Sequence, residues 1–294
     1  MKGDRLALGL LIGVVSLLGW SEGAIAQLNL IPDTAGDRNL GTTISPVQGF
    51  PIDLITGGTR PQNGQNLFHS FQEFNVNTGR GVYFNNPAGV QNIFSRITGT
   101  TRSQILGVLG VSGGNANLYL INPNGILFGP NASLDVGGSF VATTANAVQF
   151  GDQGSFSATN PTNPSPLLTV DPSAFLFTAI DRQATIVNQS AARGTTPLRG
   201  QSVLGLQVPN GQSLLLLGGD VQMAGGILQA RGGRVELGGV ADVGGVDLAV
   251  NGGEWRLQFP AGVARSDVSL IDSPLGVAGV NVAAGGISSS MPVT

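Results

Sequence analysis

The chain has 294 residues, of which 11% are charged and 41% hydrophobic, and its net charge is −3. It contains 46 glycines and no cysteine, which excludes disulfide frameworks, thiolate metal sites and cysteine nucleophiles. A weakly acidic chain with no lysine after Lys2 is a poor nucleic-acid binder, because binding to phosphate backbones depends on clustered basic residues.

Residues 1–26 have the three parts of a bacterial-type secretory signal peptide. A short basic start is followed by an apolar run over residues 6–18 and by a small-x-small pattern that ends at Ala26. The apolar run is shorter than the roughly 20 residues that a spanning helix needs. We therefore expect cleavage between Ala26 and Gln27.

The distribution of phenylalanine predicts two regions in the rest of the chain. Twelve of the 13 phenylalanines lie between Phe50 and Phe177, and residues 160–166 form a proline-rich loop. We predict an aromatic-rich domain over residues 27–180, followed by a glycine-rich β extension over residues 181–294.

Six closely spaced Gly-Gly pairs divide residues 218–253 of the extension into short pieces, with starts at residues 218, 225, 232, 238, 244 and 252. Pieces such as residues 246–250 and 254–259 alternate apolar and polar side chains, which is typical of strands with one buried face. Hairpins with Gly-Gly turns would give a meander, whereas three strand-and-corner units would give one turn of a β-helix. Because three consecutive spacings total 20, 19 and 20 residues, the pattern favours the β-helix.

The first region is also predicted to be β-rich. Runs of Thr, Val, Ile and Phe are interrupted by turn-forming pairs such as Asn63-Gly64 and Asn124-Gly125. Residues 101–109 are the one segment for which we expect a short helix. The chain as a whole is therefore predicted to be all-β.

Candidate catalytic residues are few. Ser112 lies in a Gly-x-Ser-x-Gly pattern, but a hydrolase of that kind needs a histidine base later in the chain, and the single histidine is His69. A lone histidine also cannot build the usual zinc site, and we expect His69 to be a partly buried turn residue. We predict that the chain is not an enzyme and has no cofactor or metal.

An alternative function rests on four acidic residues, Asp220, Asp242, Asp247 and Glu254. On one wall of a solenoid they could bind calcium or a sugar, which would make the chain a secreted β-helix protein that binds or degrades polysaccharide. Carboxylates on strands more often only face solvent.

The most distinctive feature is a series of strand-like blocks that end in asparagine-rich corners. The corner residues are Phe74, Asn75 and Val76, then Asn85, Asn86 and Pro87, then Asn122, Pro123, Asn124, Gly125 and Ile126. Proline fixes φ and asparagine caps turns with its side-chain amide, so each corner is a predicted turn. In order and spacing, these blocks resemble the filamentous-haemagglutinin amino-terminal domain, also called the two-partner secretion (TPS) domain, and are most similar to cyanobacterial members.

The resemblance covers about residues 27–180 and implies a right-handed parallel β-helix with an N-terminal capping region. It implies a non-enzymatic passenger that passes from the Sec machinery through the periplasm to an outer-membrane partner transporter of the Omp85/TpsB type with POTRA domains. The domain would direct translocation through residues near 70–126 and nucleate folding. The secreted or surface protein would act as an adhesin on a glycan or protein of another cell surface. A second family motif, Asn-Pro-Asn-Leu, has only partial counterparts here, at residues 86–89 and 115–118.

Overall fold

The computed structural model describes residues 30–181, 184–271, 280–283 and 287–290. The predicted signal peptide and its cleavage site, between Ala26 and Gln27, lie outside these residues. Within the described ranges, the regular elements are strands and two single-turn 3-10 helices, η1 (Gly36–Arg38) and η2 (Pro61–Asn63). Neither helix is long enough to cross a membrane.

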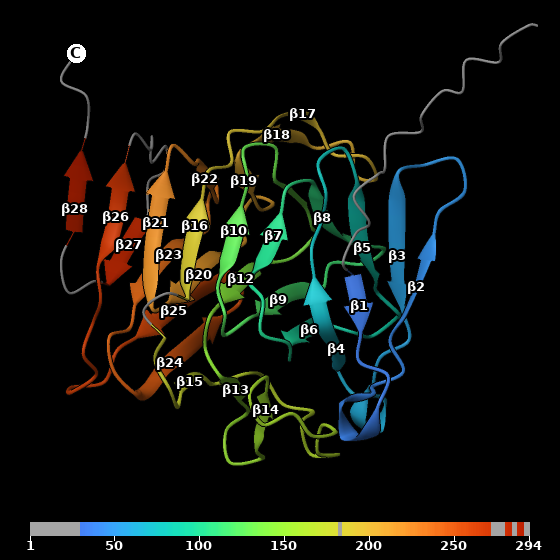
Figure 1. The fold of residues 1–294 in the computed structure, drawn as a ribbon, viewed down its shortest axis with the longest axis horizontal. Coiled ribbons are helices and arrows are strands. Elements are labelled where there is room, and N and C mark those ends of the chain that lie inside the picture. Colours follow the sequence, from blue (N-terminus) through green and yellow to red (C-terminus); the bar gives the residue numbers. More distant parts are fainter. Residues whose placement is uncertain (1–29, 182–183, 272–279, 284–286, 291–294) are drawn as a thin grey trace, which may run out of the picture.

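The strands form three parallel walls that wind around one axis, from blue to red in Figure 1. The first wall contains β4 (Asn66–Phe74), β6 (Asn92–Ile97), β9 (Asn117–Ile121), β12 (Phe140–Thr143), β20 (Leu214–Gly218), β23 (Val235–Gly239) and β27 (Val280–Ala283). The second contains β7 (Ser103–Ile105), β10 (Ile126–Phe128), β16 (Thr185–Asn188), β21 (Asp220–Ala224), β26 (Val268–Ile271) and β28 (Ile287–Ser290). The third contains β3 (Ile52–Thr56), β5 (Gly81–Asn85), β8 (Val108–Ser112) and β11 (Ser133–Asp135), with β19 (Leu206–Gln207) and β22 (Leu228–Gln229) in its place in later turns. This is the predicted right-handed parallel β-helix.

Inward-pointing side chains stack in columns, because each strand pairs in register with the strand one turn earlier. One column of the first wall runs through Leu67, Ile93, Leu118, Phe140, Leu214 and Val235. All six side chains are buried in one apolar core between the walls. Each turn therefore packs only against its neighbours, and every added turn lengthens the same core.

The short helix predicted for residues 101–109 is wrong. This segment forms β7 and the start of β8, with a corner at Gly107. A Cβ atom at Gly107 would lie 2.2 Å from Arg80 O, so the corner is too close to the previous turn for a side chain. The amides of Ser103 and Val108 donate to Gly125 O and Arg80 O, so pairing with both adjacent turns replaces the hydrogen bonds of a helix.

The Gly-Gly pairs serve two kinds of turn. The last of these six pairs, residues 252–253, makes the hairpin between the antiparallel strands β24 (Gly244–Asn251) and β25 (Glu254–Gln258). In the coil itself, Leu214 pairs with Val235, 21 residues further along, which is close to the predicted repeat. Both architectures considered for this region are therefore present: a β-helix, and a hairpin that leaves it.

That hairpin belongs to a five-stranded antiparallel sheet outside the first wall. Its other strands are β13 (Ala147–Gln149), β14 (Ser155–Ser157) and β15 (Ala174–Phe177). The two layers enclose a second apolar core, in which Phe94 stacks on Tyr119 with a centroid distance of 4.3 Å and Tyr119 on Trp255 at 5.5 Å. Because β15 pairs with β24, strands from both sides of residue 180 share one sheet. The division into a secretion domain over residues 27–180 and an extension over residues 181–294 stays a prediction.

Two antiparallel strands cap the first turn. β1 (Leu30–Pro32) pairs with β4, and β2 (Thr43–Pro46) pairs with β3. They occupy the N-terminal edges of the first and third walls, where unpaired strand edges would otherwise attract other chains. The predicted N-terminal cap is present.

A buried polar network fastens the cap to the coil. Asp33, directly after β1, accepts hydrogen bonds from Ser70 Oγ at 2.7 Å and from Thr98 Oγ1 at 2.9 Å. Arg96 donates from Nε to Ser70 Oγ at 2.8 Å and from Nη1 to Ser157 O in the outer sheet at 2.9 Å. Asp33 and Arg96 are almost inaccessible to solvent, and burial lowers the pKa of Arg96 to about 10. One network thus joins the cap, the first two turns and the outer sheet.

The expectation that His69 is a partly buried turn residue is wrong. His69 lies in the middle of β4, is fully buried, and packs against Phe84 with a ring-centroid distance of 5.2 Å. Its Nδ1 lies 3.1 Å from Thr42 Oγ1 in the cap. Burial in this apolar setting lowers its pKa to about 3, so the folded protein holds the neutral imidazole.

Replacing Arg96 by leucine should destabilise the protein strongly. The change leaves the buried carboxylate of Asp33 without its nearby positive charge, a loss of about 3–5 kcal/mol by analogy with broken buried ion pairs. Urea unfolding followed by circular dichroism measures the effect. Arg102→Leu, at an exposed position of the next corner, is the matched control, and equal losses in the two variants would contradict the role of the network.

Acidification should destabilise the fold through His69. The unfolded chain binds a proton at the ordinary pKa of 6.5 and the folded chain only near 3. The free energy of unfolding therefore keeps the full contribution of the neutral ring above pH 6.5. It loses about 1.4 kcal/mol of that contribution per pH unit as the pH falls from 6.5 towards 3. Unfolding free energies measured between pH 6.5 and 5, where few carboxylates titrate, should fall less steeply in His69→Leu. Identical slopes would show that His69 is not responsible.

Candidate functional site

The eleven corner residues identified from the sequence lie at three corners of the early turns. Residues 74–76 and 122–126 lead from the first wall to the second, and residues 85–87 lead from the third wall to the first. The first two corners belong to one edge of the coil, where Asn124 Nδ2 donates to Gly99 O of the intervening turn at 2.8 Å. The structure therefore places these residues at corners, where Pro123 and Asn124 also line a pocket of about 300 Å³.

Asn122 is the most enclosed of them. It is fully buried, and its Nδ2 donates to Thr101 O and Ser103 Oγ, each at 3.0 Å. Its Oδ1 accepts from the amide of Asn124 at 2.9 Å, which closes the corner on itself. The side chain thus ties its own corner to the segment that leads into β7, one turn earlier.

The rest of this corner is a tight turn with fixed requirements. Gly125 N donates to Asn122 O at 3.1 Å, and proline at the second position and glycine at the fourth are the preferences of a type I turn. Gly125 has φ of 105°, and a Cβ atom there would lie 2.9 Å from Thr185 O. The geometry of the type I turn therefore explains Pro123 and Gly125. The close approach of the next turn of the coil is a second reason for glycine at position 125.

The corner at residues 74–76 is hydrogen-bonded to the second wall. Phe74 ends β4 and stacks on Phe84 with a centroid distance of 5.8 Å. Asn75 Oδ1 accepts from Gln104 N at 2.8 Å, and Val76 N donates to Gln104 O at 2.8 Å. Val76 thereby forms a bridge to the second wall ahead of β7.

The corner at residues 85–87 is held in the same way. Asn85 ends β5, and the amide of Asn86 donates to Ser112 O in the next turn at 2.9 Å. Val90 N donates to Pro87 O at 3.1 Å, which closes the turn. At all three corners, the hydrogen bonds connect neighbouring turns.

Sequence inspection missed an asparagine ladder at the start of the first-wall strands. Asn92 Nδ2 donates to Asn66 Oδ1, and Asn117 Nδ2 donates to Asn92 Oδ1, both at 2.9 Å. A signal was present, because residues 65–68 (Gln-Asn-Leu-Phe) and 91–94 (Gln-Asn-Ile-Phe) are two copies of one pattern, 26 residues apart. No comparable sequence pattern indicated the Asp33–Arg96 network.

The four acidic residues proposed for a calcium or sugar site do not share one sheet, and Asp242 lies in the connection between β23 and β24. Asp220 begins β21 in the second wall, whereas Asp247 and Glu254 lie in the outer sheet, where Glu254 pairs with Arg256 at 3.6 Å. Among the described residues, no three potential metal ligands come together. Ser112 and His69 do not form a catalytic pair either, because His69 is enclosed in the core against Thr42.

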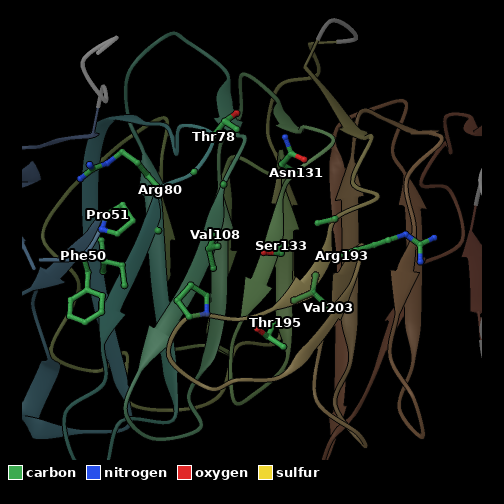
Figure 2. A pocket seen from close by; sticks show the side chains of 16 residues that line it. Phe50, Pro51, Thr78, Arg80, Val108, Asn131, Ser133, Arg193, Thr195 and Val203 are labelled. Atoms are coloured by element: carbon green, nitrogen blue, oxygen red, sulfur yellow. The ribbon is translucent and has the colours of Figure 1, made fainter. Parts of the chain in front are cut away.

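A groove of about 420 Å³ crosses the outer face of the third wall (Figure 2). Val108 and Ser133 form its floor, Phe50 borders it on one side, and the hairpin of β17 (Arg193–Thr195) and β18 (Ser202–Leu204) borders it on the other. The Arg193 head group points away from it, and Arg80 is paired with Asp53 at 2.7 Å. The groove is mainly apolar and holds no evident catalytic group.

Comparisons with known proteins agree with this architecture. The family model described as "TPS secretion domain" matches residues 36–288. Among solved structures, the HMW1 secretion domain from Haemophilus influenzae has a TM-score of 0.55 at 19% identity over 90% of this chain, which spans about half (56%) of that one. A filamentous hemagglutinin secretion domain has a TM-score of 0.40 at 15% identity, over 89% of this chain and 97% of its own. No curated protein matches. Since the family model covers most of its length, the chain belongs to the TPS secretion domain family, whose members are domains of exported proteins.

Proposed function

We propose that this chain is the passenger of a two-partner system. Its leader directs it through the Sec machinery, and the POTRA domains of an outer-membrane β-barrel partner of the TpsB type receive it in the periplasm. The barrel then delivers it to the cell surface or the medium. Membership of the TPS secretion domain family carries this proposal. The lack of cysteine supports it, because no disulfide can cross-link the chain before it threads through a pore.

The contact pattern of the coil suits folding after transit. Leu67 pairs with Ile93 and Ile93 with Leu118, so the register partners of the first turns lie only 25 or 26 residues apart. The paired cap strands β1 to β4 come from residues 30–74 alone. Each further turn can therefore add to a cap that is already formed, and the apolar surface that it buries opposes return through the pore.

The corner motif then has two successive roles. In the folded coil the amide of Asn122 is fully used within the chain, so a partner could read this side chain only before the coil closes. We infer that the partner binds residues 70–126 as an extended segment, by adding a strand to a POTRA sheet. After release, the same asparagines lock the corners.

At the cell surface we propose adhesion or surface assembly as the role of the folded coil. The resemblance of the corner blocks to filamentous haemagglutinin supports this role. Enzymatic activity has no comparable support, because the one histidine is enclosed in the core.

Replacing Asn122 by alanine should leave the protein in the periplasm. Thr101 O, Ser103 Oγ and Asn124 N lose their partner, which removes about 3 kcal/mol from the stability of the corner. Co-expression with the partner barrel, followed by immunoblotting of the medium and the periplasm, measures export. Urea unfolding of purified protein measures stability in parallel.

Asn131→Ala is the matched control, because Asn131 is exposed and lies in the following corner. It should be exported and should unfold like the wild type. Normal secretion of Asn122→Ala would reject the proposed role of the motif. A block in export without any loss of stability would assign Asn122 to partner recognition alone.

A further inference from the structure

The sequence contains four Asn-Gly pairs, at residues 63–64, 124–125, 210–211 and 251–252. Such a pair can modify itself, because glycine has no Cβ atom to hinder attack by its backbone nitrogen on the side-chain amide carbon of the asparagine. The attack needs a glycine N–H that is free of hydrogen bonds and an asparagine side chain that is free to turn towards it. The folded structure therefore decides which of the four pairs can react.

Three of the four pairs are protected by hydrogen bonds. In each of them the glycine N–H donates to a backbone carbonyl: Gly64 to Pro61 O at 2.8 Å, Gly125 to Asn122 O at 3.1 Å and Gly211 to Arg231 O at 2.8 Å. Asn124 is restrained further, because its Nδ2 donates to Gly99 O at 2.8 Å. Attack at these pairs has to wait until the hydrogen bond opens, so the rate falls with the fraction of molecules in which it is open.

The pair of Asn251 and Gly252 has neither restraint. It lies at the turn of the hairpin between β24 and β25, where both residues are exposed (Figure 1). The strand pairing closes on Asn251 and Glu254, so the two turn residues between them stay outside the ladder. Among the described residues, neither the Gly252 N–H nor the Asn251 side chain has a hydrogen-bond partner. Both reacting groups are therefore available.

We propose that Asn251 is a site of spontaneous deamidation in the folded protein, with water as the second reactant. Gly252 N forms a bond to Asn251 Cγ, and its proton leaves with the side-chain nitrogen as ammonia, so that a succinimide ring remains. One water molecule then opens the ring. Opening at the side-chain carbon gives aspartate, and opening at the backbone carbon gives isoaspartate. The net reaction consumes one water and releases one ammonia, and nothing is oxidised or reduced.

Either product disturbs the end of the hairpin. Asn251 pairs directly with Glu254, and like charges at opposite positions of two strands destabilise their pairing. Isoaspartate also lengthens the backbone by one carbon atom. The same turn is attached to the first wall, because Ser213 Oγ donates to Gly253 O at 2.7 Å. We therefore expect deamidation to loosen the hairpin from the coil and to leave the coil itself unchanged.

This inference goes beyond the proposed function and does not depend on it. The reaction needs only water and the folded hairpin, so it is tested on the purified full chain without a partner transporter. Failure of the export proposal would leave it untouched.

The test incubates the folded chain in mildly alkaline buffer made with oxygen-18-labelled water, followed by tryptic digestion in ordinary water and mass spectrometry. The peptide of residues 235–256 contains Asn251 as its only asparagine and no glutamine, so a heavy oxygen incorporated as its amide is lost reports that residue. We expect the label to enter Asn251 at least tenfold faster than Asn63, Asn124 and Asn210, because only these three need local opening. The chain unfolded in guanidinium chloride is the control, and there the four pairs should react at similar rates.

An Asn251→Gln variant, aged in parallel, tests the consequence for the hairpin. Its amide would have to close a larger ring, so this peptide should stay unlabelled. Amides of β24 and β25 should exchange hydrogen about tenfold faster in the aged wild type than in the aged variant, whereas those of β9 and β12 should not differ.

Three results would overturn the proposal. In the first, Asn251 takes up label no faster than the three protected asparagines of the folded chain. In the second, Asn251 leads by the same factor in the unfolded chain, which would assign the selectivity to the local sequence and not to the fold. In the third, the hairpins of the aged wild type and the aged Asn251→Gln variant exchange alike.

Discussion

The open end of a parallel coil is the constraint on which this structure depends. Each turn of the solenoid satisfies its backbone by pairing with the turns on either side, so the first turn has a bare edge that only an added element can cover. Here β1 and β2 cover that edge, and the buried Asp33–Ser70–Arg96 network holds the cap against the second turn and the outer sheet. Without that closure, the stacked apolar columns would have an exposed starting face.

The corner residues follow from the same constraint. A coil that turns every few residues must satisfy its corner backbone groups where no strand pairing is available. Each of three asparagines connects its corner to an adjacent turn by a hydrogen bond. Asn122 and Asn75 use the side chain, and Asn86 uses the backbone amide. The side chains of Asn122 and Asn75 are thus structural fasteners in the folded state. This is why their contribution to export is placed before or during folding.

The coil could be predicted from the sequence, but the outer sheet and the burial of His69 and Arg96 could not. Alternating strand patterns, glycine spacing and the Asn122–Ile126 block led to the parallel β-helix with its cap. The outer sheet was missed because Phe175 pairs with Val246, and no local pattern reports a partner so far along the chain. The buried states of His69 and Arg96 were missed for a similar reason, since a polar residue in an apolar strand does not reveal which layer will cover it.

Amide hydrogen exchange on the purified chain tests most directly whether the cap and the coil form one cooperative unit. The account predicts that amides of β4 and β6, next to the cap, exchange as slowly as those of β9 and β12 in the middle of the coil. Exchange in β1 to β4 that is more than about 100-fold faster than in β9 and β12 would contradict it. The cap would then open independently of the coil.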